Sequence, residues 1–282
     1  MNKVIAIVGP TASGKTDLAI KMAKELGTEI ISADSRLVYK GFDIATAKPT
    51  KEEQAQVKHH LIDIVEPEVD YSVANFHDDA KKVIDKLHKE NKIPIVVGGT
   101  GLYFRILLEN YKLPGLEADY KLRAELDKFS NEDLFNQLKQ LDELSSKKIH
   151  LNDRVRLIRA LEVIKISGKP FSQISELKEE EYDVQWLFPD TINTREELYT
   201  RINLRVDKMV ANGLIDETKY LLDKHGRIKN LVNTIGYQEI IEYLDKKITL
   251  DEAIEKIKLN TRHYAKRQLT WFRRNQNLNF SI

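Results

Sequence analysis

The feature that most constrains this chain is a segment close to its N-terminus, GPTASGKT, which matches the pattern G-x-x-x-x-G-K-[ST]. A β-branched run at residues 3–8 (KVIAIV) precedes it, as expected of a buried parallel strand. The stretch that follows has helical periodicity, with Leu18, Met22 and Leu26 on one face, and ends at Gly27. A glycine-rich turn between a strand and a helix is the context in which this pattern forms a phosphate-binding loop.

The chemistry of such a loop depends on its backbone. Glycines allow the chain to curl until its N–H groups point inward, and the N-terminus of the following helix adds positive potential. Lys15 reaches the outer phosphates of a bound ligand, and the Thr16 hydroxyl can coordinate Mg²⁺. The residues predicted to hold a polyphosphate are Gly9, Pro10, Thr11, Ala12, Ser13, Gly14, Lys15 and Thr16.

Strand and helix patterns continue to alternate after the loop. Residues 29–33 (EIISA) predict a second strand with Asp34 at its carboxyl end, and residues 72–90 predict a helix capped by Ser72. A third strand is indicated at 93–97 (IPIVV), followed by a glycine-rich turn and another helix. This alternation predicts an α/β fold of the P-loop nucleoside-triphosphate-hydrolase type, with a parallel sheet and flanking helices.

The pattern changes after residue 114. Up to about residue 180 only helical segments are indicated, at 119–128, 131–143 and 152–167. Residues 184–188 then return to the sheet as a strand, and the chain from Thr194 onward is mostly helical. We therefore expect residues 1–114 and 184–282 to form the α/β core with a helical C-terminal part, and 115–183 to form an all-helical insertion.

Composition places the chain among globular proteins. Of its 282 residues 41% are hydrophobic and 32% are charged, and no run of about eighteen apolar residues could span a membrane. The N-terminal apolar run stops at strand length, so a signal peptide is not indicated. The chain has no cysteine, which excludes disulfides and cysteine-based zinc sites and fits a cytoplasmic location.

The net charge of +1 hides an uneven distribution of basic residues. Residues 256–282 contain seven lysines and arginines and no acidic residue. Lys258, Arg262 and Lys266 are spaced by four and share one face of a predicted helix. Such a stripe is either a solvated face or a surface for the phosphates of a nucleic acid. The absence of acidic residues there, together with Arg267 and Arg273, favours phosphate contact.

A phosphate-binding loop does not by itself identify the ligand. ATP- and GTP-using enzymes place an acidic residue after a nearby hydrophobic strand, but the strand at 93–97 is followed by Gly98-Gly99-Thr100-Gly101. Asp34 ends the other strand, where on position alone it could equally cap a turn. Arg201 and Arg205, spaced by four, could reach a diphosphate but are not included in the predicted site. A small-molecule kinase and an RNA-binding module with a vestigial loop are both compatible with these residues.

Seven segments, in order over nearly the whole chain, carry a resemblance to one family. They are GPTASGKT, SADSRLVYKGFDIATAKPT (32–50), HHLIDIVEP (59–67), YSVANF (71–76), VGGTGLY (97–103), NDRVRLIRALEV (152–163) and RHYAKRQLTWFR (262–273). Together they resemble the bacterial tRNA dimethylallyltransferase family, also called the IPP transferase family.

The resemblance implies a reaction. Members transfer a dimethylallyl group from dimethylallyl diphosphate to the exocyclic N6 amine of the adenosine 3′ of the tRNA anticodon, and release diphosphate. The loop then holds the diphosphate of the prenyl donor, which fits the missing acidic residue because no γ-phosphate is attacked. The resemblance also implies Mg²⁺ as cofactor and the tRNA anticodon stem-loop as partner. The sequence leaves the oligomeric state open, and a monomer is the default expectation.

The resemblance assigns roles by position. Asp34 matches the general base that accepts a proton from the attacking amine, and Thr100 matches a contact to the flipped base and the donor. The residues that match tRNA contacts are Asp34, Ser35, Arg36, Leu37, Thr100, Arg123, Val155, Arg156, Leu157, Ile158 and Arg159. The sequence departs from the family pattern at Leu37, where glutamine is common, and at Ala45, where glycine is common. Without the resemblance, Thr100 could simply support its glycine turn.

Overall fold

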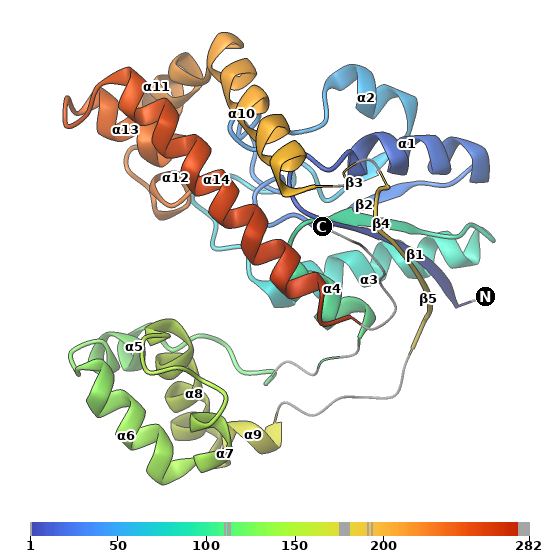
Figure 1. Cartoon of the computed structure of the whole chain (residues 1–282). Helices are drawn as coiled ribbons and strands as arrows, with labels where there is room; N and C mark the ends of the chain where they lie inside the picture. The colour runs from blue at the N-terminus through green and yellow to red at the C-terminus, as the bar shows by residue number, and fades with distance from the viewer. Residues whose placement is uncertain are drawn as a thin grey trace. The chain divides into compact units, whose positions relative to one another are not determined.

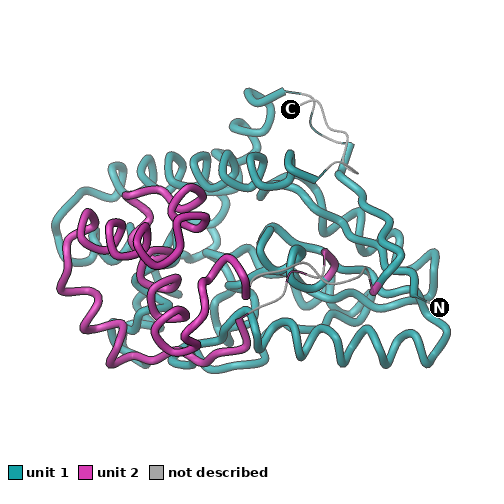
Figure 2. Tube along the Cα trace, turned by 90° about the horizontal axis from the view of Figure 1, so that it is seen from below, with its two compact units in different colours: residues 1–107, 182–282 teal, residues 108–181 magenta. Residues whose placement is uncertain are grey.

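A computed structural model describes residues 2–109, 111, 114–174, 181–190, 192 and 194–275 (Figure 1). They divide into two compact units, Met1–Leu107 with Tyr182–Ile282 as unit 1, and Leu108–Glu181 as unit 2 (Figure 2). The sequence predicts the first boundary at Pro114 and Gly115. The observed boundary lies earlier, between residues 107 and 108, where helix α4 (Gly101–Leu108) ends.

Unit 1 contains the parallel sheet that the sequence predicts. Its strands are β1 (Lys3–Val8), β2 (Ile30–Ser32), β3 (His59–His60), β4 (Ile95–Gly98) and β5 (Asp183–Leu187), in the order β3-β2-β4-β1-β5. Every neighbouring pair is parallel. The strands at both ends of the unit's sequence therefore meet in one sheet.

The two crossover helices cover opposite faces of this sheet. Helix α1 (Lys15–Leu26) links β1 to β2 and helix α3 (Val73–Lys89) links β3 to β4, so the two connections run across the sheet in opposite directions. Since both crossovers are expected to be right-handed, the helices must lie on opposite faces (Figure 1). Ile5 and Ile7 of β1 pack with α1, and alternation turns Val4 and Ala6 to the other face.

Local signals set the ends of these helices. Gly27 ends α1 in the left-handed conformation, at φ 59°, as the sequence predicts. Ser72 caps α3 in a capping box with Asn75. Two short elements have no counterpart in the prediction, helix α2 (Lys51–Gln56) and strand β3.

The C-terminal part of unit 1 is helical. It comprises α10 (Arg195–Ala211), α11 (Leu214–His225), α12 (Lys229–Val232), α13 (Tyr237–Leu244) and α14 (Leu250–Phe272). The segment after β2 packs into these helices, where the ring of Phe42 meets that of Tyr237 edge-on, with centroids 4.9 Å apart. This apolar contact fixes the chain that follows Asp34 against the helical part.

Unit 2 is all helical among its described residues. Its helices are α5 (Tyr120–Leu126), α6 (Asn131–Leu141), α7 (Glu143–Ser146), α8 (Arg154–Ser167) and α9 (Phe171–Ile174). Leu126, Leu134, Leu138, Leu157 and Leu161 form its buried core. In both units, none of the helices that the structure describes has the length and apolar composition needed to cross a membrane.

Candidate active site

Three neighbouring strands, β2, β4 and β1, end at the same edge of the sheet. Val8 of β1 is in register with Gly98 of β4, and Ser32 of β2 with Val97 of β4. The segments after these strands are the phosphate loop, Asp34 and the turn with Thr100. The carboxyl edge of a parallel sheet is the usual place for a ligand, and the fold brings these three motifs together there.

The loop after β1 has the curled backbone that its glycines permit. Gly9 has a φ of 152° and Gly14 a φ of 80°, and Ala12 also adopts a positive φ, of 63°. A Cβ atom at Gly9 would lie 3.0 Å from the Ser13 Oγ and 3.2 Å from the Phe188 ring, so no larger residue fits without movement. The sequence of the loop therefore encodes its shape.

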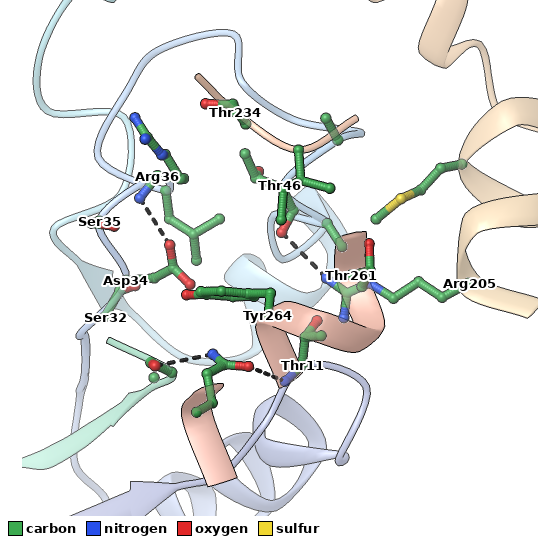
Figure 3. Close-up of a pocket in the computed structure, with 18 of the residues that line it drawn as sticks. Thr11, Ser32, Asp34, Ser35, Arg36, Thr46, Arg205, Thr234, Thr261 and Tyr264 are labelled. Atoms are coloured by element: carbon green, nitrogen blue, oxygen red, sulfur yellow. Dashed lines mark hydrogen bonds between the residues drawn. The ribbon is translucent and has the colours of Figure 1, made fainter. Parts of the chain in front are cut away.

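A cavity of about 630 Å³ opens at this edge. Thr11, Lys15 and Thr16 line it, whereas the other predicted loop residues lie outside its lining and shape the turn: Gly9, Pro10, Ala12, Ser13 and Gly14. Asp34, Ser35, Arg36 and Leu37 line the cavity as well, and so does Ala45. Asp34, Ser35 and Arg36 thus line the same cavity as the phosphate loop (Figure 3).

Positive charge gathers on one side of the cavity. Arg205, from α10, donates from Nη2 to the Thr46 carbonyl at 3.3 Å and lines the cavity with Lys15. Burial and, to a smaller extent, the charge of Arg205 lower the pKa of Lys15 to about 7, although the charge of Asp34 acts in the opposite direction. Burial also lowers the pKa of Arg205. Two desolvated cations in one cavity, close enough for the charge of Arg205 to act on Lys15, are suited to an anion of high charge such as a diphosphate.

Arg205 lines the cavity, although the sequence does not predict it as a site residue. Arg201, its companion in the sequence, instead pairs with Glu197 at 3.0 Å. The i, i+4 spacing could not distinguish the two residues, because the orientation of α10 depends on packing that the sequence pattern does not specify.

Asp34 is half-buried at the end of β2. Its Oδ1 accepts a hydrogen bond from the Arg36 amide at 2.8 Å, so it caps the turn as position alone suggested (Figure 3). Thr100 supports this turn from β4. Its Oγ1 accepts from the Ser35 amide at 3.2 Å, and its own amide donates to the Ala33 carbonyl at 3.3 Å. Thr100 itself is outside the cavity lining. Its contacts therefore position Asp34 and Ser35.

Close packing explains the glycine that precedes this turn. A Cβ atom at Gly98 would lie 2.1 Å from the Ala33 carbonyl oxygen, which belongs to backbone and cannot move aside cheaply. Glycine at this position lets β4 and the end of β2 approach closely enough for Thr100 to reach the Asp34 turn.

Helix α14 supplies a wall of the cavity that the sequence analysis did not predict. Thr261, Tyr264 and Gln268 lie at helical spacing and all line the cavity. The Gln268 side chain is buried and bridges two motifs. Its Oε1 accepts from the Thr11 amide at 2.9 Å, and its Nε2 donates to the Gly99 carbonyl at 3.0 Å. This amide holds the phosphate loop against the turn that carries Thr100.

Replacing Gln268 with leucine should weaken donor binding. The Thr11 amide and the Gly99 carbonyl would lose their partner, and an unpaired buried group costs about 1–3 kcal/mol. We expect the KM for the phosphate ligand to rise by about tenfold, with a smaller loss in kcat, as judged by steady-state kinetics. Gln185→Leu, at an exposed position of β5, is the control. An unchanged KM in Gln268→Leu would show that the bridge does not set the loop geometry.

The basic stripe on α14 is only partly available. Lys258 pairs with Asp207 of α10 at 2.9 Å, and Arg262 donates to the Asn203 side chain at 2.7 Å. These two residues hold α14 against α10 and are not a free surface for phosphates. Lys266 and Arg267 remain exposed, and Arg267 also lines the cavity.

In unit 2, several residues with predicted tRNA contacts surround one buried carboxylate. Glu162 is fully buried and accepts from the Arg123 Nε at 2.8 Å and from the Arg159 Nη1 at 2.5 Å. The hydrogen bonds from these arginines hold the pKa of Glu162 below its usual value against the opposing effect of burial. Both arginine side chains stay partly exposed, at 37% and 28%. The carboxylate therefore fixes them while part of each remains at the surface.

The members of the predicted tRNA-contact stretch differ in exposure. The side chain of Leu157 is fully buried in the core of unit 2, so it is not presented at the surface. Val155 is 80% exposed, Arg156 is also exposed, and Ile158 is partly buried. The prediction treated the stretch as a unit, whereas helical geometry turns its members to different sides.

The described residues include no group of three or more His, Cys, Asp or Glu side chains that could hold a metal ion. The Thr16 hydroxyl nevertheless brings a hard oxygen atom to the cavity. Mg²⁺ commonly binds through few protein oxygens and completes its shell with phosphate and water, so this residue fits a metal that arrives with a diphosphate.

Comparisons with known proteins identify the family of this chain. The model of the family described as IPP transferase matches residues 37–275. A tRNA dimethylallyltransferase of Fusobacterium nucleatum is 47% identical over 274 residues, which cover 97% of this chain and 89% of that protein. One of Halalkalibacterium halodurans is 46% identical over 281 residues, with 98% and 90% covered.

Two solved structures are similar over most of this chain. The crystal structure of a tRNA isopentenylpyrophosphate transferase from Bacillus halodurans has a TM-score of 0.71 and 44% identity, and covers 98% of this chain and 88% of that one. A eukaryotic dimethylallyltransferase acting on tRNA has a TM-score of 0.84 and 30% identity, with 96% and 70% covered. Sequence, fold and the arrangement of motifs around one cavity therefore agree: the chain belongs to the IPP transferase family.

Proposed function

We propose that this protein is a tRNA dimethylallyltransferase. It transfers the dimethylallyl group of dimethylallyl diphosphate to the N6 amine of the adenosine 3′ of the anticodon and releases diphosphate. The observation that carries the proposal is the placement of Lys15 and Arg205 in the same cavity as Asp34. The two cations can stabilise the leaving diphosphate, and the carboxylate can accept the proton of the attacking amine in the same reaction.

The diphosphate of the donor binds at the phosphate loop. Loop amides and the N-terminus of α1 attract its oxygens, and Lys15 and Arg205 neutralise the charge that grows as the C–O bond breaks. Thr16 is the protein ligand that we propose for Mg²⁺. When bound, the metal adds further positive charge beside the leaving group.

Asp34 acts on the attacking amine. The lone pair of an adenine amine is delocalised into the ring, so the amine is a weak nucleophile. A carboxylate that accepts the amine proton as the C–N bond forms lowers the barrier. Because the Oδ1 of Asp34 is held by the Arg36 amide, the carboxylate has a fixed orientation. Thr100 contributes by holding Ser35, the residue next to the base.

tRNA binding involves residues of both units. Ser35, Arg36 and Leu37 line the cavity and are placed to meet the target base, which must leave its stack to reach a buried donor. In unit 2 the proposed contacts are Arg123, Val155, Arg156, Ile158 and Arg159. All groups proposed for the chemistry come from one chain, so we propose that a monomer is active, and that it acts on tRNA in the cytoplasm.

Transfer of label tests the function directly. Purified protein and Mg²⁺ are incubated with radiolabelled dimethylallyl diphosphate and unmodified tRNA that has adenosine 3′ of its anticodon. We expect label in the RNA, and none in a tRNA with guanosine at that position. A protein that binds the tRNA and transfers no label would overturn the proposal. Greater thermal stabilisation by ATP than by the prenyl donor would then favour the kinase alternative.

A further inference from the structure

We propose that the ring of Tyr264 is a catalytic group that stabilises positive charge on the dimethylallyl carbons during transfer. The inference rests on the proposed function and assigns a role to a residue that the sequence analysis did not select. Tyr264 lies in the middle of α14, and it is partly buried in the wall of the cavity.

The position of the ring is the first argument. In Figure 3 the ring extends from α14 across the cavity, with its hydroxyl end toward Asp34 and with Arg205 on the other side. The negative charge of Asp34 contributes to raising the pKa of the Tyr264 hydroxyl, as expected of two groups that lie near each other. The ring therefore lies between the groups proposed to receive the amine proton and the diphosphate. A donor whose diphosphate lies near Arg205 and whose C1 reacts beside Asp34 would place its allyl carbons near this ring.

The chemistry of the transfer is the second argument. The bond between C1 of the donor and the diphosphate oxygen breaks, and its electron pair leaves with the diphosphate. The amine lone pair forms the new N6–C1 bond, and the N6 proton passes to Asp34. If bond breaking runs ahead of bond formation, positive charge spreads over C1 and C3 of the allyl group.

This charge needs a particular kind of neighbour. Lys15 and Arg205 repel it, although both are required for the leaving group. A second carboxylate would attract the allyl group and could also capture it as an ester. An aromatic face attracts a cation through its quadrupole and offers no lone pair that forms a strong bond with carbon. Among the described cavity-lining residues, Tyr264 is the one that has a benzene-type ring.

One further contact limits the movement of the ring. The exposed guanidinium of Arg267 lies 5.7 Å from the ring centroid. Burial raises the pKa of Tyr264, with a further contribution from the charge of Asp34. The hydroxyl therefore stays protonated at neutral pH and does not compete with Asp34 as a base. The ring, rather than the phenol oxygen, is the functional part.

Substitutions separate the ring from the hydroxyl. In single-turnover experiments with saturating donor and tRNA, Tyr264→Phe should transfer at a rate within about threefold of the parent protein. Tyr264→Leu should be slower by about ten- to a hundredfold, the fold-change expected for a desolvated cation–π contact. Tyr220→Leu, at an exposed tyrosine of α11, should leave the rate unchanged. Equal rates for the Phe and Leu variants would overturn the proposal.

A second series tests electronic character at constant shape. Phenylalanines with one, two, three and five ring fluorines are introduced at position 264, and fluorination weakens the quadrupole of the ring step by step. We expect the logarithm of the transfer rate to fall steadily with fluorination while the Kd values of donor and tRNA stay constant. A purely structural role of the ring would give a flat series. If the parent protein transfers no label, the proposed function fails; if it transfers and the series is flat, this inference alone fails.

Discussion

Asp34→Asn is expected to lower the single-turnover rate of prenyl transfer by about a thousandfold, within the range that general bases contribute. The affinities for donor and tRNA should change little. Asparagine keeps the Oδ1 that accepts from the Arg36 amide at 2.8 Å, so the turn after β2 is preserved. It loses the ability to accept a proton. The substitution therefore distinguishes a catalytic base from a residue that only caps a turn, because a cap is served equally well by both side chains.

Two measurements make this prediction decisive. Thermal unfolding should show that Asp34→Asn is folded as stably as the parent, and Asp223→Asn, at an exposed position of α11, serves as the control for removal of a carboxylate. A rate within a few-fold of the parent would contradict the assignment. The Asp34 carboxylate would then only hold Arg36, and the amine would lose its proton to water.

The core of unit 1 follows from local patterns. The strands β1, β2 and β4 and the helices α1 and α3 each have a periodic run and an end signal such as Gly27 or Ser72. Strand β3 has two residues, which is too short for any periodicity to emerge. Its pairing of His59 with Ile30 depends on the segment after Asp34 returning to the sheet edge, which is a tertiary effect.

Topology alone accounts for part of the arrangement of the predicted site residues. Parallel strands end at one edge, so the phosphate loop and Asp34 had to be neighbours once the sheet was predicted. Arg205 and Gln268 reach the same cavity from helices far along the chain. Helical periodicity indicates which residues share a face, but not what that face packs against. For the same reason, the sequence pattern does not predict that Lys258 pairs with Asp207.

Lys15→Met is expected to abolish most activity and, at the same time, to stabilise the ligand-free protein. Loss of the ammonium should lower kcat/KM by about a hundred- to a thousandfold, because the leaving diphosphate loses a fixed positive charge. Yet burial, with the nearby charge of Arg205, lowers the pKa of this lysine from 10.5 to about 7 in the folded protein. Without a bound anion, the buried site beside Arg205 therefore disfavours the charged form of the Lys15 side chain.

The pH dependence of stability gives the sign of this effect. Between pH 7 and 10.5 the unfolded chain binds a proton at Lys15 that the folded protein does not bind, so the free energy of unfolding rises with pH over this range. Below pH 7 the penalty is fully present. Lys15→Met should therefore be more stable than the parent by an amount on the order of a few kcal/mol at pH 6.5, and the difference should shrink as the pH approaches 10.5.

Urea unfolding at pH 6.5 and pH 9.5 measures this difference, with Lys21→Met, at an exposed position of the same helix, as the control. Inorganic diphosphate should reverse the order of stability, because it stabilises the parent and binds the variant poorly. Its binding to the parent at pH 8 should also take up a proton, which calorimetry in buffers of different ionisation enthalpy detects. A variant less stable than the parent at both pH values would mean that the hydrogen bond from Lys15 to the Pro10 carbonyl outweighs the cost of burial. The lysine would then stabilise the folded loop even without a ligand, and its ammonium would not be an unfavourable buried charge that only a bound diphosphate offsets.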